Sequence, residues 1–283
     1  MASPNKVKNF PIFLFLFLFL IYWLIKNLTT SVFLKNKERI NVVFYSKNTT
    51  FFSLSQHDVN YLFSFPSSAE VLVPGGYGNY KVGALGKLVS LEDKPVLLKK
   101  VFSGATSSFI DLYFYPVKTE IYYDNFDSPN FPGFSEVFLS KSNANFIDRL
   151  FLLGKLFDRN QSNYKIISLT KALFDQSQFG RDFQGSFYKK SYRNIGTNVQ
   201  IIYTKSYSTA NFLSQIIDGE GIKVVDISQS DSDTANCRII AKKIDVVGRA
   251  LSDFFGCPVK TGETTISDII LEVGSLEKDW AVK

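Results

Sequence analysis

Histidine and cysteine are scarce in this chain, and their scarcity excludes several kinds of site. The 283 residues include one histidine, His57, and two cysteines, Cys237 and Cys257. A structural zinc site takes its ligands mainly from thiolates and imidazoles, and the chain has no Cys-x-x-Cys pair to supply them. A Ser-His-Asp triad would have to use His57, which stands beside Asp58 in a loop-like stretch. The sequence therefore supports neither zinc binding nor this kind of hydrolysis.

Dense clusters of positive charge are also missing. The formal net charge is +6 at pH 7, and the densest basic groups are the pairs Lys99-Lys100, Lys189-Lys190 and Lys242-Lys243. Nucleic-acid binders normally concentrate such residues on one face, and no segment has the pattern of a helix-turn-helix. The charge balance therefore argues against nucleic acid as a partner. It allows only a mild preference for anionic surfaces or phosphorylated ligands.

What the chain does have is a long apolar run near its N-terminus. Residues 10–25 carry no charge and include Trp23 close to their end. A membrane-spanning helix needs about 18 or more apolar residues, which are available if the span continues beyond Lys26. We therefore expect a membrane anchor at residues 10–34, preceded by a cytoplasmic tail at residues 1–9. The alternative is a cleaved signal peptide, whose apolar core is about 7–15 residues long and ends at small residues.

The charges that flank this run disagree with the orientation we expect. Two lysines precede the run, and four basic residues follow it: Lys26, Lys35, Lys37 and Arg39. The positive-inside rule would place the body in the cytoplasm. We nevertheless expect a single-pass protein of the cell membrane with an extracytoplasmic body, because the rest of the sequence favours export.

The sequence after the anchor predicts an α/β fold in two domains, residues 36–196 and 197–283. The first domain opens with short β-branched or aromatic runs between turns, which are typical of strands. Helical periodicity follows, and then another strand. The expected strands are 40–45, 51–55, 59–65, 70–73 and 109–115, and the expected helices are 80–88, 96–102, 134–139, 145–157 and 169–177. This order is typical of a layered α/β domain.

Two further segments complete the first domain. Residues 124–132 predict a loop, in which Asp124 and Asp127 would make a poor pair of metal ligands. The charged and polar segment 189–196 predicts a boundary between the domains.

Residues 197–283 predict two strand–helix–strand halves in a small α+β domain. The helix of each half ends at a glycine, which is a common helix terminator. The expected strands are 199–203, 222–227, 237–240 and 268–273, and the expected helices are 210–218 and 246–255.

A glycine-rich turn at residues 74–78 lies where a phosphate-binding loop could form. It precedes a predicted helix, so that backbone N–H groups could meet an anion beside Lys81 or Lys87. Its spacing fits neither the P-loop nor the Gly-x-Gly-x-x-Gly fingerprint. A tight turn that merely requires positive φ angles is an equal alternative.

Residues 39–115 resemble the N-terminal half of the LytR-CpsA-Psr domain of bacterial envelope proteins. The residues that carry the similarity are Arg-Ile-Asn-Val-Val at 39–43, Ser-Phe-Pro at 64–66, Val-Leu-Val-Pro-Gly at 71–75, Lys81, Ala84 and Ile-Asp-Leu-Tyr at 110–113. Active members of this family transfer a polymer from a polyprenyl pyrophosphate carrier to peptidoglycan. They hold the pyrophosphate and a divalent metal with arginines and acidic residues.

The chain departs from the family where the pyrophosphate would be held. The family reads Ser-Ile-Pro-Arg-Asp-Thr where residues 64–69 are Ser-Phe-Pro-Ser-Ser-Ala, and residues 47–50 lack the expected acid. Because a pyrophosphate needs several cations and a metal, the resemblance implies a non-catalytic binding or scaffolding relative. The alternative is an active glycopolymer transferase that holds the pyrophosphate through Lys81, Lys87 and Arg193. Only the transferase alternative implies a cofactor, which is Mg²⁺. The sequence identifies no catalytic residues for it.

Residues 197–283 resemble the C-terminal domain that often follows in the same family. The closing signature appears as Asp-Ile-Ile-Leu-Glu-Val-Gly at 268–274 and Asp-Trp at 279–280, whereas Thr-Lys-Ser-Tyr at 204–207 replaces the family's Asn-Gly-x-Gly. Both resemblances are to extracytoplasmic domains behind one anchor, and paired cysteines suit an oxidising compartment. We therefore expect a Cys237–Cys257 disulfide. The implied role is in cell-wall biogenesis, and the implied partners are the membrane and a polyprenyl pyrophosphate lipid, peptidoglycan or a cell-wall glycopolymer.

Overall fold

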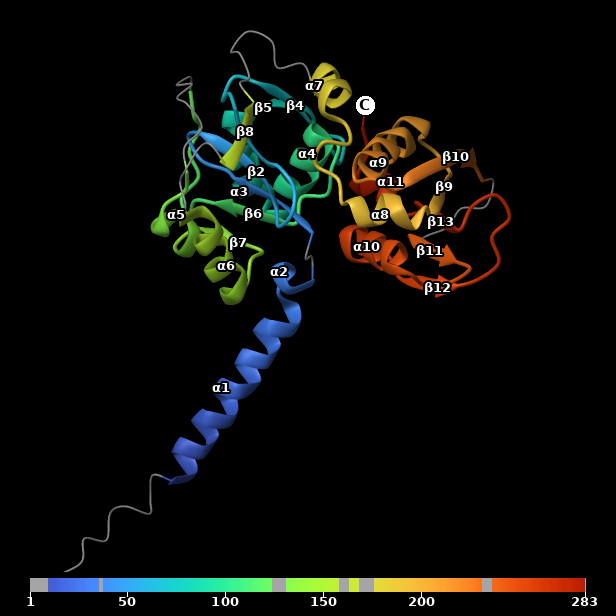
Figure 1. Cartoon of the computed structure of the whole chain (residues 1–283). Helices are drawn as coiled ribbons and strands as arrows, with labels where there is room; N and C mark the ends of the chain where they lie inside the picture. Colours follow the sequence, from blue (N-terminus) through green and yellow to red (C-terminus); the bar gives the residue numbers. More distant parts are fainter. Residues whose placement is uncertain are drawn as a thin grey trace, which may run out of the picture.

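A long helix projects from a body that is built on two larger β-sheets (Figure 1). The computed structural model describes residues 10–35, 38–123, 131–157, 163–167, 176–230 and 236–282. The projecting helix, α1 (Phe10–Thr30), has 21 residues, and an 18-residue window within residues 11–30 has a mean hydropathy of 2.1, so that the helix is long and apolar enough to cross a membrane. A short helix, α2 (Val32–Lys35), connects α1 to the body. The predicted apolar helix is therefore present.

The first sheet has six strands in the order β7-β6-β1-β2-β3-β8. Strands β1 and β6 are parallel, as are β3 and β8, whereas β2 is antiparallel to both of its neighbours. Its strands are β1 (Arg39–Phe44), β2 (Thr49–Ser55), β3 (Asn60–Phe65), β6 (Leu112–Tyr115), β7 (Lys141–Ser142) and β8 (Tyr164–Ile167). Next to it, β4 (Glu70–Val73) and β5 (Gly78–Lys81) form a separate antiparallel pair.

Helices cover both faces of the first sheet. Successive residues of a strand point to opposite faces; accordingly, Val43 and Phe51 belong to one core cluster, and Val42 and Phe52 to another. The covering helices are α3 (Leu85–Glu92), α4 (Val96–Thr106) and α7 (Gln176–Phe183) on one face, and α5 (Phe134–Phe138) and α6 (Phe146–Phe157) on the other. This first part of the body is therefore layered, with the sheet between two sets of helices.

The second sheet has five strands in the order β10-β9-β13-β11-β12. Its strands are β9 (Asn198–Tyr203), β10 (Lys223–Gln229), β11 (Arg238–Ala241), β12 (Val259–Thr261) and β13 (Ile269–Glu272), and its helices are α9 (Tyr207–Gly219), α10 (Val246–Phe255) and α11 (Leu276–Asp279). The six elements predicted for this part are confirmed, and β12 and α11 are additional. The predicted Cys237–Cys257 disulfide is also present, and it joins the residue before β11 to the residue that follows the glycine at the end of α10.

One predicted helix begins later than expected. Instead of being helical from residue 80, the chain forms β5, then a 3-10 turn at Val82–Ala84, and enters α3 only at Leu85. Gly75 and Gly76, with φ +94° and +82°, lie in the turn that returns the chain against β4, and Gly78, with φ +79°, begins β5. The hairpin pairing therefore takes precedence over the helical periodicity of this stretch.

The segment that we predicted to be a boundary is mostly helical. Residues 190–195 form α8 (Lys190–Ile195), and Tyr192 is buried in the core of the second part. The predicted domain limits themselves, 36–196 and 197–283, stay a prediction. Most of the helix predicted at 169–177 and most of the loop predicted at 124–132 lie outside the described residues.

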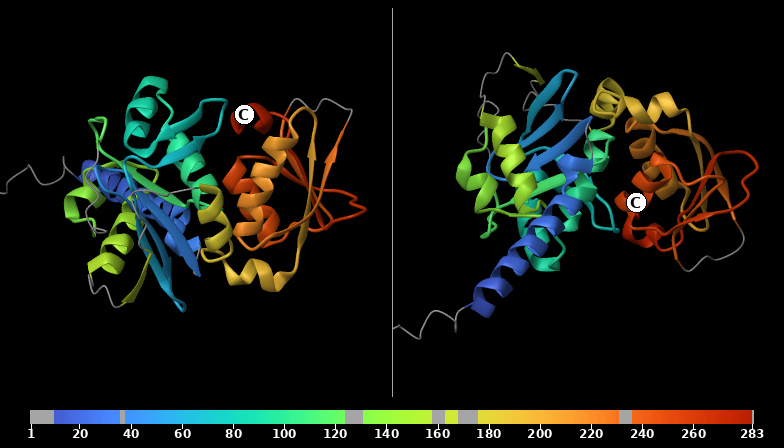
Figure 2. Two further views of the ribbon diagram at one scale, coloured as in Figure 1. Left: turned by 90° about the horizontal axis from the view of Figure 1, so that it is seen from above. Right: turned by 60° about the horizontal axis from the view of Figure 1, so that its bottom comes forward.

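The two parts of the body meet along α4 and α9 (Figure 2). Glycines permit the close approach: a Cβ atom on Gly104 would lie 2.3 Å from Cζ of Phe212, and one on Gly219 would lie 1.8 Å from the carbonyl oxygen of Ser107. The C-terminal segment adds a further contact, because the carbonyl oxygen of Ala281 accepts hydrogen bonds from the first part.

Candidate functional site

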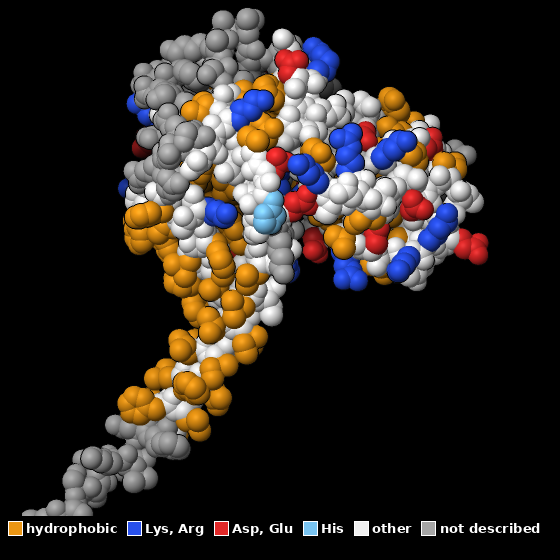
Figure 3. Space-filling model, in the orientation of Figure 1, with side chains coloured by type: hydrophobic (Ala, Val, Ile, Leu, Met, Phe, Trp, Pro, Cys, Tyr) orange, Lys and Arg blue, Asp and Glu red, His pale blue; other side chains and the backbone are white. Residues whose placement is uncertain are grey.

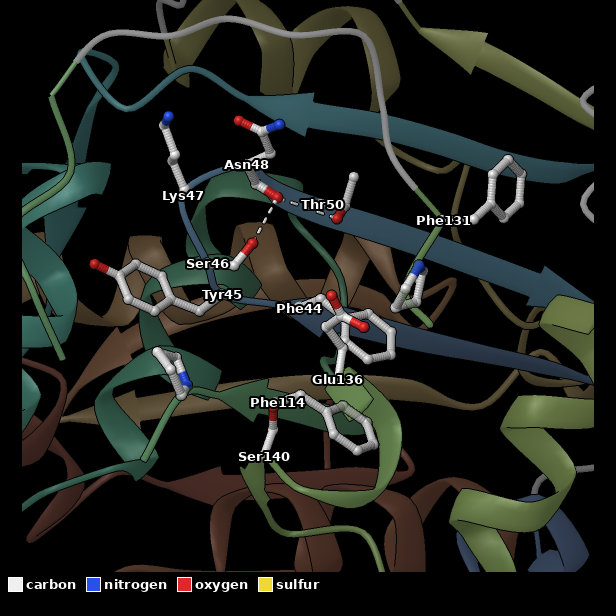
Figure 4. A pocket seen from close by; sticks show the side chains of 12 residues that line it. Phe44, Tyr45, Ser46, Lys47, Asn48, Thr50, Phe114, Phe131, Glu136 and Ser140 are labelled. Carbon is white, nitrogen blue, oxygen red and sulfur yellow. Dashed lines mark hydrogen bonds between the residues drawn. The ribbon is translucent and has the colours of Figure 1, made fainter. Parts of the chain in front are cut away.

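A pocket of about 300 Å³ lies at the carboxyl ends of the parallel strands β1 and β6 (Figure 4). Ligands of open α/β sheets bind in the crevice outside the carboxyl ends of the strands, so the topology makes this edge a candidate site. Residues 44–48 form one wall, and Phe114, Phe131 and Glu136 contribute to the others.

The polar groups of this sheet-edge pocket are largely engaged within the protein. The Ser46 hydroxyl donates to the carbonyl oxygen of Asn48 at 3.0 Å, and Glu136 Oε2 accepts the N–H of Gly133 at 2.8 Å. Among the described lining residues Lys47 is the one cation, at a position where the family resemblance leads us to expect an acid. Among the described residues of the lining, the charged side chains are therefore Lys47 and Glu136.

Aromatic side chains in the walls of this pocket are held in place by packing and hydrogen bonds. The rings of Phe44 and Phe114 stack with their centroids 4.6 Å apart. The Tyr45 hydroxyl donates to the carbonyl oxygen of Gly83 at 3.1 Å and accepts the N–H of Gly86 at 2.7 Å. Burial raises the pKa of Tyr45, so that the phenol stays protonated.

A larger cleft of about 630 Å³ opens where the two parts of the body meet. Of the described residues, Arg181 on α7, Arg193 on α8 and Lys223 on β10 line it, together with a single carboxylate, Asp218 of α9. Asp218 Oδ1 accepts the N–H of Val224 at 2.8 Å, and burial raises the pKa of this carboxyl group. Three cations around one carboxylate make this interdomain cleft electropositive.

Tyrosines complete the interdomain cleft. The guanidinium carbon of Arg193 lies 5.4 Å from the centre of the Tyr188 ring, within the range of a cation–π contact. Tyr192 also lines the cleft, and burial raises its pKa to about 12. Arginine binds phosphate and carboxylate groups through two parallel hydrogen bonds, and aromatic rings offer apolar faces. The cleft is therefore equipped for an anionic ligand.

Next to Tyr188, Lys189 forms a buried cluster with one carboxylate from each part of the body. Its Nζ lies 3.3 Å from Asp111 Oδ1 and 3.1 Å from Glu220 Oε1. The N–H groups of Asn41 and Phe109 donate to Asp111 and Glu220 at 2.9 and 2.8 Å. Burial raises the pKa of Glu220 to about 7, and Lys189 offsets part of this rise. Burial opposes the charge of Lys189, but the two carboxylates outweigh it and raise its pKa.

Of the three predicted ligand-binding residues, Arg193 lines the interdomain cleft. Lys81 and Lys87 are exposed on β5 and α3 of the first part, and neither is among the residues of that cleft. The N–H groups of residues 75–76 donate to the carbonyl oxygen of Ala281 at 3.0 Å, so these two donors of the glycine turn are already engaged. The part that Lys81 and Lys87 play in binding stays a prediction.

His57 lies in a separate pocket with Asp58 and two cations. Asp58 Oδ2 is 2.9 Å from Lys190 Nζ and 3.6 Å from Arg39 Nη2. The hydrogen bond from Lys190 is the largest cause of the lowered pKa of Asp58. Asp58 therefore forms ion pairs with Lys190 and Arg39 and is not placed to orient His57.

Several residues of these sites were not predicted from the sequence. Arg181 and Lys223 stand in unremarkable stretches, and Lys189 belongs to a pair that looks exposed. The one available signal was the excess of basic residues over acidic ones. Within the described ranges, no three His, Cys, Asp or Glu side chains group as metal ligands, and Asp124 and Asp127 lie outside those ranges.

Comparisons of the chain with protein-family models, curated proteins and solved structures find no match. The resemblance to the LytR-CpsA-Psr family therefore stays a prediction.

Proposed function

We propose that this chain is a single-pass membrane protein of the cell envelope whose extracytoplasmic body binds a phosphate-bearing glycan, free or on its polyprenyl pyrophosphate carrier. Binding takes place in the interdomain cleft and does not lead to transfer of the glycan. The observation that carries the proposal is the convergence of Arg181, Arg193 and Lys223 on one cleft in which the described residues include a single carboxylate. In terms of the family resemblance, the protein is a non-catalytic relative that takes part in cell-wall biogenesis.

The contacts of α1 support an uncleaved anchor. Asn27 is buried, and its Oδ1 accepts the N–H of Phe146 at 3.3 Å. Ser31 donates its hydroxyl to Asp148 Oδ1 at 2.6 Å. Cleavage beyond these residues, as in a signal peptide, would remove packing that the body uses. The end of α1 is therefore better explained as a permanent part of the protein.

The disulfide supports a body outside the cytoplasm. Cys237 and Cys257 are bonded, and such bonds persist mainly in oxidising compartments. This observation weighs against the flanking charges, which favour the opposite orientation.

The size and lining of the cleft suit the proposed ligand. Small-molecule sites typically have volumes of about 300–1,000 Å³, and this cleft has about 630 Å³. Arg193 and Arg181 provide guanidinium groups for phosphate oxygens, and Tyr188 and Tyr192 provide faces on which sugar rings can pack.

Transfer of the glycan would need more than this cleft provides. Phosphoryl chemistry depends on a metal ion and on several cations that meet at the pyrophosphate. Lys81, Lys87 and Arg193 lie on three different elements, and only Arg193 lines the cleft. This distribution favours binding over the transferase alternative.

The test uses the full chain in detergent with polyprenyl pyrophosphate and, as a tail-free probe, inorganic pyrophosphate. At about 100 times the Kd we expect the ligand to stabilise the fold by about 2.7 kcal/mol, equally with and without Mg²⁺. Arg193→Gln and Lys223→Gln each remove a charged hydrogen-bond donor worth about 1.5–3 kcal/mol, so each should weaken binding at least about tenfold.

Lys87→Gln, an exposed lysine of α3 outside the cleft, is the matched control and should bind like the wild type. Equal effects of Lys87→Gln and Arg193→Gln would place the ligand elsewhere. Transfer of a glycan from a glycan-bearing polyprenyl pyrophosphate donor to peptidoglycan in the presence of Mg²⁺, with release of the polyprenyl carrier, would overturn the non-catalytic assignment.

A further inference from the structure

Helices α5 and α6 carry an exposed apolar surface on the body. Phe157 is 82% exposed, Leu139 70% and Phe134 62%, and Leu150 and Phe151 are 45% and 46% exposed. Figure 3 shows hydrophobic side chains gathered on this side of the body and continuing onto α1. These five residues and Phe146 are called the α5–α6 face below.

The sequence pattern of α6 is not that of a helix with one face in water. Asp148, Leu152 and Leu156 recur every fourth residue and are buried against the body. On the opposite side, where a surface helix normally carries polar residues, α6 has Phe146 and Leu150. The helix is therefore apolar towards both the body and its outer surroundings.

The α5–α6 face is continuous with α1. The ring centroids of Phe146 and Trp23 lie 5.4 Å apart, and those of Phe151 and Phe33 lie 6.0 Å apart. The N–H of Phe146 also donates to Asn27 Oδ1. The first turn of α6 thus packs against the last turns of α1.

The level of this contact can be related to a bilayer. A helix rises about 1.5 Å per residue, so the 21 residues of α1 span about 32 Å, close to the hydrocarbon thickness of about 30 Å. Trp23 stands seven residues before Thr30, about 10 Å along the helix, which is within the depth of about 5–10 Å at which interfacial helices bury their apolar face. Phe146 packs on Trp23 and therefore lies at the same level.

The charges of α6 suit phospholipid headgroups. Lys155 is exposed, whereas the carboxylate of Asp148 is buried and accepts hydrogen bonds from Ser31. Arg149 donates to the carbonyl oxygen of Ser140 at 3.1 Å. The outer side of α6 therefore presents no carboxylate that would repel anionic lipids, and the lysine stem can extend to the headgroups.

We propose that the α5–α6 face lies at the boundary between headgroups and acyl chains of the leaflet in which α1 ends. The body is then seated on the bilayer in one orientation, instead of being held away from it by α1 alone. This inference rests on the anchoring part of the proposed function. Amphipathic helices bind at this depth by burying their apolar face among the lipids.

The test places a fluorescent label on α6 of the full chain in phosphatidylcholine–phosphatidylglycerol vesicles. Because both native cysteines are disulfide-bonded, Leu150→Cys provides a single reactive thiol for an environment-sensitive dye. We expect blue-shifted emission that is quenched by a phospholipid with a nitroxide near the top of its acyl chain and is protected from aqueous iodide. Val225→Cys, an exposed apolar position on β10, is the matched control and should show the opposite behaviour.

Iodide quenching of the Leu150→Cys label as strong as that of the control would show that the face is in water and would refute the proposal. Energy transfer between labelled copies, without quenching by the nitroxide lipid, would show that a second copy covers the face, which also overturns it. Alkaline extraction of the same vesicles tests α1 by itself. A chain that resists extraction but exposes its label refutes only the seating, whereas an extracted chain refutes the anchor.

Discussion

Lys189 is one cation facing two carboxylates, and this imbalance makes folding stability depend on pH. Burial raises the pKa of Glu220 from 4.5 to about 7, with Lys189 offsetting part of the rise. A group whose pKa is raised by folding stabilises the protein fully below its unfolded pKa and loses that contribution as the pH rises through the folded pKa. We therefore predict that ionisation of Glu220 lowers the free energy of unfolding by up to about 3 kcal/mol between pH 4.5 and 7. Urea titrations of the wild type and Glu220→Gln should show this slope only in the wild type.

Glu263→Gln, which changes an exposed glutamate, should keep the wild-type slope. Parallel pH profiles for the wild type and Glu220→Gln would contradict the prediction. Neither member of the Lys189–Glu220 pair could be predicted as buried, because the partner Asp111 lies 78 residues from Lys189 in the chain. The ion pair of Lys189 and Glu220 forms only when the two parts of the body pack together, so the local sequence around each residue gives no sign of it.

At the scale of elements, the close contact of α4 and α9 depends on glycine. A Cβ atom on Gly219 would lie 1.8 Å from the backbone oxygen of Ser107, which cannot move aside as a flexible side chain could. We predict that Gly219→Ala destabilises the protein by about 1–3 kcal/mol, the usual cost of overpacking. Chemical denaturation of the full chain in detergent measures this cost.

Gly154→Ala is the matched control, since a Cβ atom at this helical glycine meets nothing within 4 Å. It should be neutral or stabilising by up to about 1 kcal/mol, because alanine favours helix. A Gly219→Ala variant as stable as Gly154→Ala would show that α4 and α9 can separate without loss.

The elements that could be predicted are those whose pattern is local and strong. Strands β1 to β3 and helices α6, α9 and α10 follow from β-branched alternation or helical periodicity with clear ends. The prediction was wrong for the start of α3, where pairing of β5 with β4 decides the conformation. The two- to four-residue strands β7, β12 and β8 were missed because such short runs carry too little periodicity.

At the scale of the whole molecule, the apolar N-terminal helix and the disulfide could be predicted, whereas the interdomain cleft could not. An apolar run and a cysteine pair are visible in the sequence itself. The cleft brings together Arg181, Arg193 and Lys223 from three elements, and their meeting depends on how α4 packs against α9. Of these three residues, only Arg193 was predicted to bind a ligand. It was grouped with Lys81 and Lys87, whereas in the structure it lies with Arg181 and Lys223.

The junction between α1 and the body determines whether these parts act as one unit. Asp148 of α6 accepts the hydroxyl of Ser31 at 2.6 Å and the N–H of Phe33 at 3.2 Å. Hydrogen bonds to a buried charged group are worth about 1.5–3 kcal/mol, so Asp148→Ala should ease local opening of α2 by about 2 kcal/mol. Trypsin cleavage after Lys35 through that opening should then accelerate roughly 30-fold.

Asp253→Ala, which removes an exposed carboxylate of α10, is the control and should leave the cleavage rate unchanged. Equal rates for Asp148→Ala and the wild type would show that α2 is held by its apolar contacts, such as the packing of Phe33 on Phe151. A specific acceleration would instead show that the hydrogen bonds of Asp148 fix the body on α1. Such a fixed junction is what a body needs if its α5–α6 face is to meet the bilayer in a single orientation.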